Sequence, residues 1–136
     1  MIEEKKSRDL PPLLGQVAAG FPSPAEQYAE PGLDLNKLLV KRAAATFYLR
    51  ATGESMVGAC ILHGDILIVD RSIRPFDGCI VIARVDGEFT VKYYRVTSDG
   101  PVLEAANPQF KPIRFAEGME LHIDGVVTAV IHQFIP

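Results

Sequence analysis

Short apolar runs rich in Val, Ile, Phe and Tyr follow one another after Ala45, and polar turns containing glycine separate them. Runs of this length and composition are typical of β-strands, and Gly, Asp and Pro between them indicate turns. The predicted strands are residues 46–51, 66–70, 79–85, 89–96, 102–105 and 121–131. This spacing predicts a mainly β fold, a single twisted and mostly antiparallel β domain.

One turn is predicted in more detail. Asp86-Gly87 stands between the runs 79–85 and 89–96. A two-residue type I′ hairpin turn needs positive φ at both central positions, which Asp and Gly tolerate well. We therefore expect a tight hairpin that returns Lys92 to a place beside residues 80–85.

The chain before residue 45 has a different pattern. Asp34 precedes leucines at helical spacing (Leu35, Leu38 and Leu39), which predicts an N-cap and one short amphipathic helix over 34–40. Residues 1–32 are rich in proline and glycine, which disfavours regular structure. We expect an extended or mobile arm over 1–32 and a β-rich domain over 33–136. The prolines of the arm are Pro11, Pro12, Pro22, Pro24 and Pro31.

Composition and charge narrow the class of protein. At 136 residues and 48% hydrophobic content, the chain suits one domain with its own core. The net charge of −3 and the lack of a Lys/Arg cluster argue against direct DNA binding, so any link to DNA should run through a partner. The longest apolar stretch, 125–131, is too short to span a bilayer, and residues 1–6 lack a signal-peptide core. A soluble, unexported, cytoplasmic protein is expected.

The cysteines and histidines offer no metal-binding pattern. Cys60 and Cys79 lie within apolar runs without CxxC spacing, so we expect reduced, buried and inert thiols. His63, His122 and His132 also lack metal-ligand spacing and are interpreted as ordinary structural or surface residues. No metal and no cofactor is predicted.

Ser55 is a candidate nucleophile. It lies between Gly53 and Gly58 in a segment of small residues, where the backbone can turn sharply and expose a hydroxyl group. Nearby amides, including that of Ser55 itself, could then bind an oxyanion. The alternative is a loop serine whose hydroxyl satisfies its own backbone, and a serine taken alone favours that alternative.

Lys92 is the candidate base. It stands in the middle of an apolar strand, in phase with Thr90 and Tyr94. A lysine accepts a proton near neutral pH only if its pKa falls from about 10.4 to near 7, which requires an apolar setting. The alternative is an outward-facing, solvated lysine, which is the usual position of a charged residue.

Four motifs together resemble the LexA/UmuD family of self-cleaving proteins. They are Gly53-Glu54-Ser55-Met56 and the segments 64–70, 77–83 and 86–92, which agree with the family in order, spacing and strand context. The resemblance implies that Ser55 is the nucleophile and Lys92 its general base. It also implies that the fold is that of a LexA/UmuD-like protease.

The arm resembles the UmuD/MucA type within this family. The segment 20–25 is similar to the UmuD arm, no helix-turn-helix domain fits before it, and the resemblance extends over about 17–130. It implies self-cleavage at Ala19-Gly20, a homodimer, and cleavage stimulated by RecA filaments on single-stranded DNA. It further implies a UmuC-type Y-family polymerase partner in error-prone translesion synthesis during the SOS response.

Two other functions remain open from the residues themselves. A non-catalytic β-rich interaction module would keep Ser55 and Lys92 as structural residues. A signal-peptidase-like enzyme would use the same two residues on other proteins, although it would ordinarily need a membrane anchor. The sequence does not choose between cleavage within one chain and cleavage between chains.

Overall fold

The computed structural model describes residues 9–24, 27–30, 32–115 and 118–136, with 27–30 described by their backbone. The chain forms two compact units, Met1–Lys41 and Arg42–Pro136. The predicted division at residue 32 falls inside the first of these units. The parts of the predicted arm at 1–8, 25–26 and 31 lie outside the described residues.

The described residues of the first unit include two paired strands and the predicted helix. Strands β1 (Leu13–Gly15) and β2 (Gln27–Glu30) pair antiparallel, with an irregularity between two of the paired positions. The expectation that this region lacks regular structure is therefore wrong. Its described prolines lie before β1 or in the connection between the strands, so none of them removes a donor from the ladder.

Helix α1 (Leu35–Leu39) begins as the sequence predicts. Asp34 has an extended backbone, and its Oδ1 accepts hydrogen bonds from the amides of Asn36 (3.0 Å) and Lys37 (3.3 Å). A carboxylate that accepts from the first free amides of a helix is an effective N-cap. The predicted short helix is thus confirmed.

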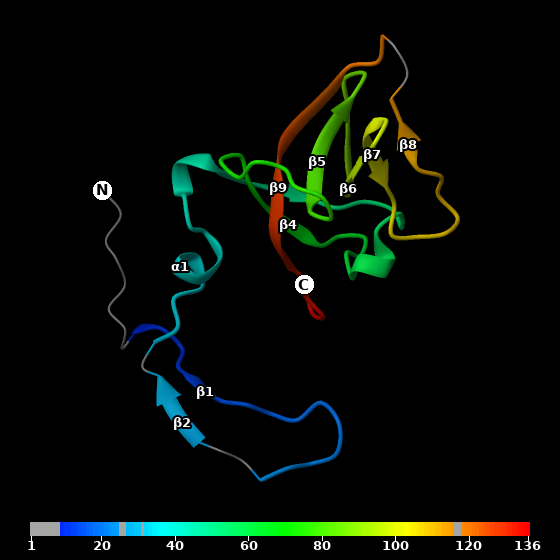
Figure 1. The fold of residues 1–136 in the computed structure, drawn as a ribbon. Helices are drawn as coiled ribbons and strands as arrows, with labels where there is room; N and C mark the ends of the chain where they lie inside the picture. Colours follow the sequence, from blue (N-terminus) through cyan, green and yellow to red (C-terminus); the bar gives the residue numbers. More distant parts are fainter. Residues whose placement is uncertain (1–8, 25–26, 31, 116–117) are drawn as a thin grey trace. The chain divides into compact units, whose positions relative to one another are not determined.

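The second unit is built on one seven-stranded sheet in the order β3-β4-β9-β5-β6-β7-β8, in which every neighbouring pair is antiparallel (Figure 1). The long strand β9 lies between β4 and β5. Its strands are β3 (Thr46–Arg50), β4 (Ile66–Asp70), β5 (Ile80–Val85), β6 (Glu88–Thr97), β7 (Gly100–Glu104), β8 (Ile113–Arg114) and β9 (Leu121–Ile131). The prediction of a mainly β, mostly antiparallel fold is confirmed.

The hairpin between β5 and β6 sets the position of Lys92. Asp86 has φ 49° and Gly87 has φ 87°, the two positive values that a type I′ turn requires. The register then pairs Val85 with Glu88 and Val81 with Lys92. Lys92 therefore lies beside β5, as predicted.

Buried side chains form two clusters on opposite faces of β5. Ile82 belongs to one cluster with Leu67 and Val69, whereas Val81 belongs to the other with Leu103. Neighbouring residues of a strand point to opposite faces, so both faces of the central sheet are covered. Because both faces are covered, a polar side chain on this sheet can be surrounded by apolar groups and lose its contact with water.

The two cysteines differ in exposure. Cys79 is 6% exposed and belongs to the second cluster, as expected. Cys60 is exposed, so the prediction of a buried thiol is wrong for this residue. Cys60 ends a short 3-10 helix, Val57–Ala59, in the left-handed backbone region (φ 62°), and it therefore belongs to a surface loop and not to an apolar strand.

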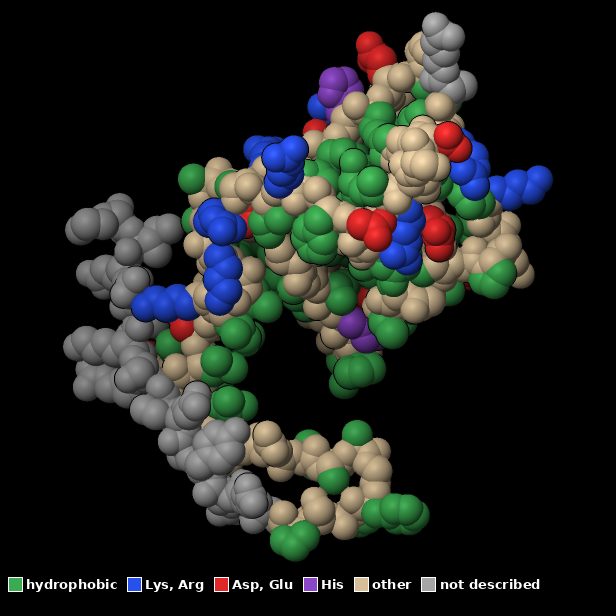
Figure 2. Space-filling view, viewed as in Figure 1, with side chains coloured by type: hydrophobic (Ala, Val, Ile, Leu, Met, Phe, Trp, Pro, Cys, Tyr) green, Lys and Arg blue, Asp and Glu red, His purple; other side chains and the backbone are tan. Residues whose placement is uncertain are grey.

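The surface of the second unit carries both signs of charge. Ion pairs join Arg84 to Asp124 (2.9 Å) and Arg95 to Glu104 (3.6 Å). Figure 2 shows basic and acidic side chains interspersed on one face. No helix within the described residues is long and apolar enough to cross a bilayer.

Candidate active site

The Ser55 loop follows β3 and is fixed at several points. Met56, next to Ser55, is 2% exposed and packs in the first core cluster, while Ser55 itself is half-buried. Gly53 has φ +83°, a conformation that a side chain would disfavour, and its amide donates to Nδ1 of His63 over 3.1 Å. The loop therefore turns sharply just before Ser55.

The connector between β7 and β8 holds the same loop from another side. The Gly58 amide donates to the Ala106 carbonyl over 2.7 Å. The Asn107 side-chain amide donates to the Glu54 carbonyl over 2.9 Å. Ser55 thus lies between two backbone groups that are tied to residues far away in the sequence.

Lys92 reaches Ser55 from the middle of β6. The residue is 8% exposed, and its Nζ donates to Ser55 Oγ over 2.9 Å. Two further acceptors surround the amine: Thr90 Oγ1 at 2.9 Å and the Val91 carbonyl at 3.1 Å. The structure therefore brings the two sequence-predicted residues into direct contact.

The electrostatic setting of Lys92 favours the neutral amine. Burial lowers the pKa of Lys92 below its ordinary value of 10.5, because desolvation disfavours the ammonium form. The ion pairs among the described residues do not include Lys92, so no carboxylate counteracts this effect. A lysine in this setting is present as the neutral amine, the form that can accept a proton, at lower pH than one in water.

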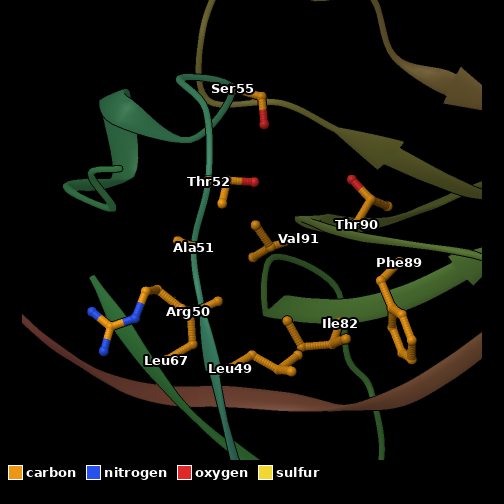
Figure 3. A pocket seen from close by; sticks show the side chains of 10 residues that line it. All are labelled: Leu49, Arg50, Ala51, Thr52, Ser55, Leu67, Ile82, Phe89, Thr90 and Val91. Carbon is orange, nitrogen blue, oxygen red and sulfur yellow. The ribbon is translucent and has the colours of Figure 1, made fainter. Parts of the chain in front are cut away.

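A cavity of about 240 Å³ adjoins Ser55. Figure 3 shows the hydroxyl groups of Ser55 and Thr90 at one end, with Leu67 and Ile82 at the other. The lining residues are Leu49, Arg50, Ala51, Thr52, Ser55, Leu67, Ile82, Phe89, Thr90 and Val91. The cavity lining is therefore mixed, with apolar side chains at one end and hydroxyl groups near the candidate nucleophile at the other.

The edge of the sheet beside this cavity is open to pairing. β3 is the terminal strand of its sheet and pairs with β4 alone among the described strands. A terminal strand presents backbone donors and acceptors that an extended peptide can join. Arg50, the last residue of β3, lines the cavity, so such a peptide would pass near Ser55.

Two of the three histidines make structural contacts, and His122 is exposed. Nδ1 of His63 accepts the Gly53 amide, and His132 contacts the buried Asp65. The Leu62 amide and His132 hydrogen-bond to Asp65 and lower the pKa of its carboxyl. Among the described residues, no group of three or more His, Cys, Asp or Glu side chains could hold a metal ion.

The candidate scissile bond belongs to the first unit. Ala19 and Gly20 are exposed and lie in a bend between β1 and β2. A Cβ added at Gly20 would meet nothing within 4 Å. The backbone around this bond is therefore accessible, as a peptide substrate must be.

A mainly antiparallel β protein with a desolvated lysine at a serine hydroxyl, beside an open strand edge, has the features of a serine peptidase. The sequence model of the peptidase S24-like family matches residues 12–128, and the chain belongs to this family. The resemblance to the LexA/UmuD proteins is confirmed by the same finding together with the relatives described next.

Three relatives illustrate the similarity. Protein ImpA of Salmonella typhimurium is 49% identical over 125 residues, which cover 90% of this chain and 83% of ImpA. Protein MucA of Escherichia coli is 39% identical over 121 residues, covering 88% of this chain and 82% of MucA. The LexA repressor of Photorhabdus laumondii is 38% identical over 123 residues, covering 90% of this chain but 61% of the repressor.

Several residues of the site were not predicted. The position of the Thr90 hydroxyl beside Lys92 could have been predicted, because residues 90 and 92 lie on the same face of a strand. The sequence signal for Asn107 is weaker. Asn107-Pro108 indicates a turn, but nothing in the neighbouring sequence connects that turn to Glu54. The contact exists only because the fold brings the connector to the Ser55 loop.

Proposed function

We propose that this chain is a serine endopeptidase that cleaves its own Ala19-Gly20 bond, with Ser55 as nucleophile and Lys92 as general base. The observation that carries the proposal is the 2.9 Å contact between Lys92 Nζ and Ser55 Oγ, made by a buried lysine. A serine hydroxyl becomes a competent nucleophile when an adjacent base removes its proton.

The three partners of Lys92 suit both of its protonation states. The neutral amine has two N–H donors and one lone pair, which match Thr90 Oγ1, the Val91 carbonyl and the Ser55 hydroxyl proton. After proton transfer, the ammonium has three donors for the same three oxygens. Thr90 and Val91 therefore orient the lone pair toward Ser55 before the reaction and stabilise the charge that follows.

The proposed reaction proceeds through an acyl-enzyme. The Ser55 proton moves to Lys92 Nζ while Oγ bonds to the Ala19 carbonyl carbon, and the Ser55 amide donates to the resulting oxyanion. The carbon–nitrogen bond then breaks, and Lys92 returns its proton to the Gly20 amine. Lys92 next takes a proton from water, which attacks the acyl carbon. The bond between that carbon and Ser55 Oγ then breaks, Lys92 returns the proton to Oγ, and the Ala19 carboxyl group is released.

The substrate segment suits the cleft. Val17-Ala18-Ala19-Gly20 has small residues around the bond, so an extended backbone can pair with β3 without steric conflict. Gly20 and Ser55 are 35 positions apart, so the intervening chain could span about 115 Å when extended. This reach permits cleavage within one chain or between two, and tethering raises the effective concentration of the bond.

The cellular role proposed for the chain is that of the UmuD/MucA type: a homodimeric accessory subunit in SOS mutagenesis. Self-cleavage would be stimulated by RecA filaments on single-stranded DNA, and the trimmed product would join a UmuC-type Y-family polymerase in translesion synthesis. Membership of the peptidase S24-like family and similarity to ImpA and MucA support this role.

Intact-mass measurement of the purified chain tests the proposal. During incubation from neutral to alkaline pH, a product of residues 20–136 should accumulate faster as Lys92 loses its proton, and RecA filaments should accelerate it at neutral pH. Ser55→Ala and Lys92→Ala should stop cleavage, whereas the exposed controls Ser98→Ala and Lys111→Ala should not. Cleavage of Ser55→Ala at the unmutated rate would refute the mechanism, and no cleavage under any condition would favour the non-catalytic module.

A further inference from the structure

The Glu54 carbonyl, immediately before Ser55, accepts hydrogen bonds from two directions. One donor is the Val57 amide, which closes the local turn over 3.4 Å. The other is the Asn107 side-chain amide at 2.9 Å, which comes from the connector between β7 and β8. The Asn107 contact is the shorter of the two hydrogen bonds and comes from a segment far away in the sequence. It therefore fixes the direction of this carbonyl.

The direction of that carbonyl determines the direction of the Ser55 N–H. Both groups belong to one planar trans peptide unit, in which the C=O and the N–H point in opposite directions. With its carbonyl directed toward Asn107, the unit directs the Ser55 N–H away from the connector. Within the described part of the chain, this N–H has no hydrogen-bond acceptor.

We propose that Asn107 is a positioning residue that sets the plane of the Glu54–Ser55 peptide, so that the Ser55 N–H faces the oxyanion formed during cleavage. This inference rests on the proposed function and adds a residue to it. Donation to the carbonyl also polarises the peptide unit, which makes its N–H a stronger donor.

The other end of the Asn107 side chain fixes its orientation. Its Oδ1 accepts the Gln109 amide over 3.0 Å, so the NH₂ group is the end that faces Glu54. Asn107→Asp separates the two roles of this side chain, because it keeps an acceptor for Gln109 but places an oxygen against the Glu54 carbonyl.

Self-cleavage of the full chain at alkaline pH is the first measurement. Loss of one oxyanion donor typically lowers the rate by about 10²–10³-fold, so Asn107→Asp, which misdirects such a donor, should lower it by at least about tenfold. The contact lies at the surface, so the urea midpoint should change little. Gln109→Ala is the matched control, because Gln109 contributes its backbone amide to the turn, and it should cleave at the unmutated rate.

A second measurement separates positioning from simple displacement of the loop. The measurement uses a chain that carries Ser55→Cys and Cys60→Ser, in which the remaining native thiol, Cys79, is buried. Alkylation of position 55 by iodoacetamide then depends on the introduced thiol and on Lys92, but it forms no oxyanion. Adding Asn107→Asp should leave the alkylation rate and its pH profile unchanged.

A parallel fall in alkylation and cleavage would overturn the inference, because Asn107 would then hold the whole loop and not one peptide plane. Cleavage of Asn107→Asp at the unmutated rate would overturn it as well. Both outcomes differ from failure of the proposed function, which appears as cleavage of Ser55→Ala at the unmutated rate or as no cleavage of the unmutated chain.

Discussion

Replacing Gly58 with alanine should separate cleavage from stability at the point where the Ser55 loop meets the β7–β8 connector. The Gly58 amide donates to the Ala106 carbonyl over 2.7 Å, and a Cβ at position 58 would lie 2.5 Å from that same oxygen. Carbon and oxygen in close contact remain about 3.3 Å apart. The added methyl group therefore displaces the loop by about 0.8 Å or breaks the hydrogen bond.

The size of the effect follows from this displacement. Inserting a methyl group into a close-packed contact typically costs about 1–3 kcal/mol of stability. A misplacement of roughly 1 Å at a catalytic group can lower a rate by about 10²-fold. We therefore expect Gly58→Ala to remain folded in dilute buffer but to cleave itself about a hundredfold more slowly.

Gly125→Ala is the matched control. Its Cβ would lie 2.6 Å from Val69 Cγ1 and 3.0 Å from the Asp70 carbonyl, a comparable conflict between β9 and β4. Urea unfolding should show similar losses of stability for the two variants, and intact-mass time courses should show slow cleavage for Gly58→Ala alone. Equal cleavage rates in the two variants, or a Gly58→Ala rate within twofold of the unmutated chain, would refute the reasoning.

Three further predictions concern single groups. Burial lowers the pKa of Lys92, so the unfolded chain binds more protons than the folded chain between that pKa and 10.5. Lys92→Met should therefore stabilise the fold most below the lowered pKa, and urea midpoints should show this gain shrinking as pH rises toward 10.5, whereas a constant gain would contradict the prediction. Cys60 should react quickly with a thiol reagent and Cys79 only after unfolding, and two fast thiols would exclude the buried position of Cys79. The Leu62 amide and His132 lower the pKa of Asp65 from 3.8, so the stabilisation that the ionised carboxylate gives is present above pH 3.8 and is lost as pH falls through the lowered pKa. Urea midpoints of Asp65→Asn should lack this loss at acid pH, and equal pH dependence in the variant and the unmutated chain would count against the prediction.

The sequence predicted the elements that depend on local patterns. The runs that became β4 and β9 have the predicted bounds, and Asp86-Gly87 forms the predicted turn, because strand and turn preferences act over a few residues. β8 was missed, since two residues are too few for an alternating pattern. The pairing of β1 with β2 was missed because prolines nearby suggested an irregular segment.

The site depended on contacts that no local pattern contains. Ser55 and Lys92 each had an ordinary interpretation, and the family resemblance, not periodicity, joined them. Their contact requires the register of β6 on β5 and the packing of Met56 in the core. The tie from Asn107 to Glu54 links segments that are close only after the sheet has formed. Such contacts lie beyond what single-sequence patterns indicate.

The hairpin at Asp86-Gly87 makes the proposed self-cleavage depend on the pairing register of β5 and β6. Side chains alternate between the two faces of a strand, so a slip of one residue between β5 and β6 would send Lys92 to the opposite face and place a neighbour such as Val91 where the amine belongs. A misregistered chain could still be compact and rich in β structure, yet it would have no base at Ser55. Self-cleavage would then occur only in molecules in which β5 and β6 are paired in the correct register.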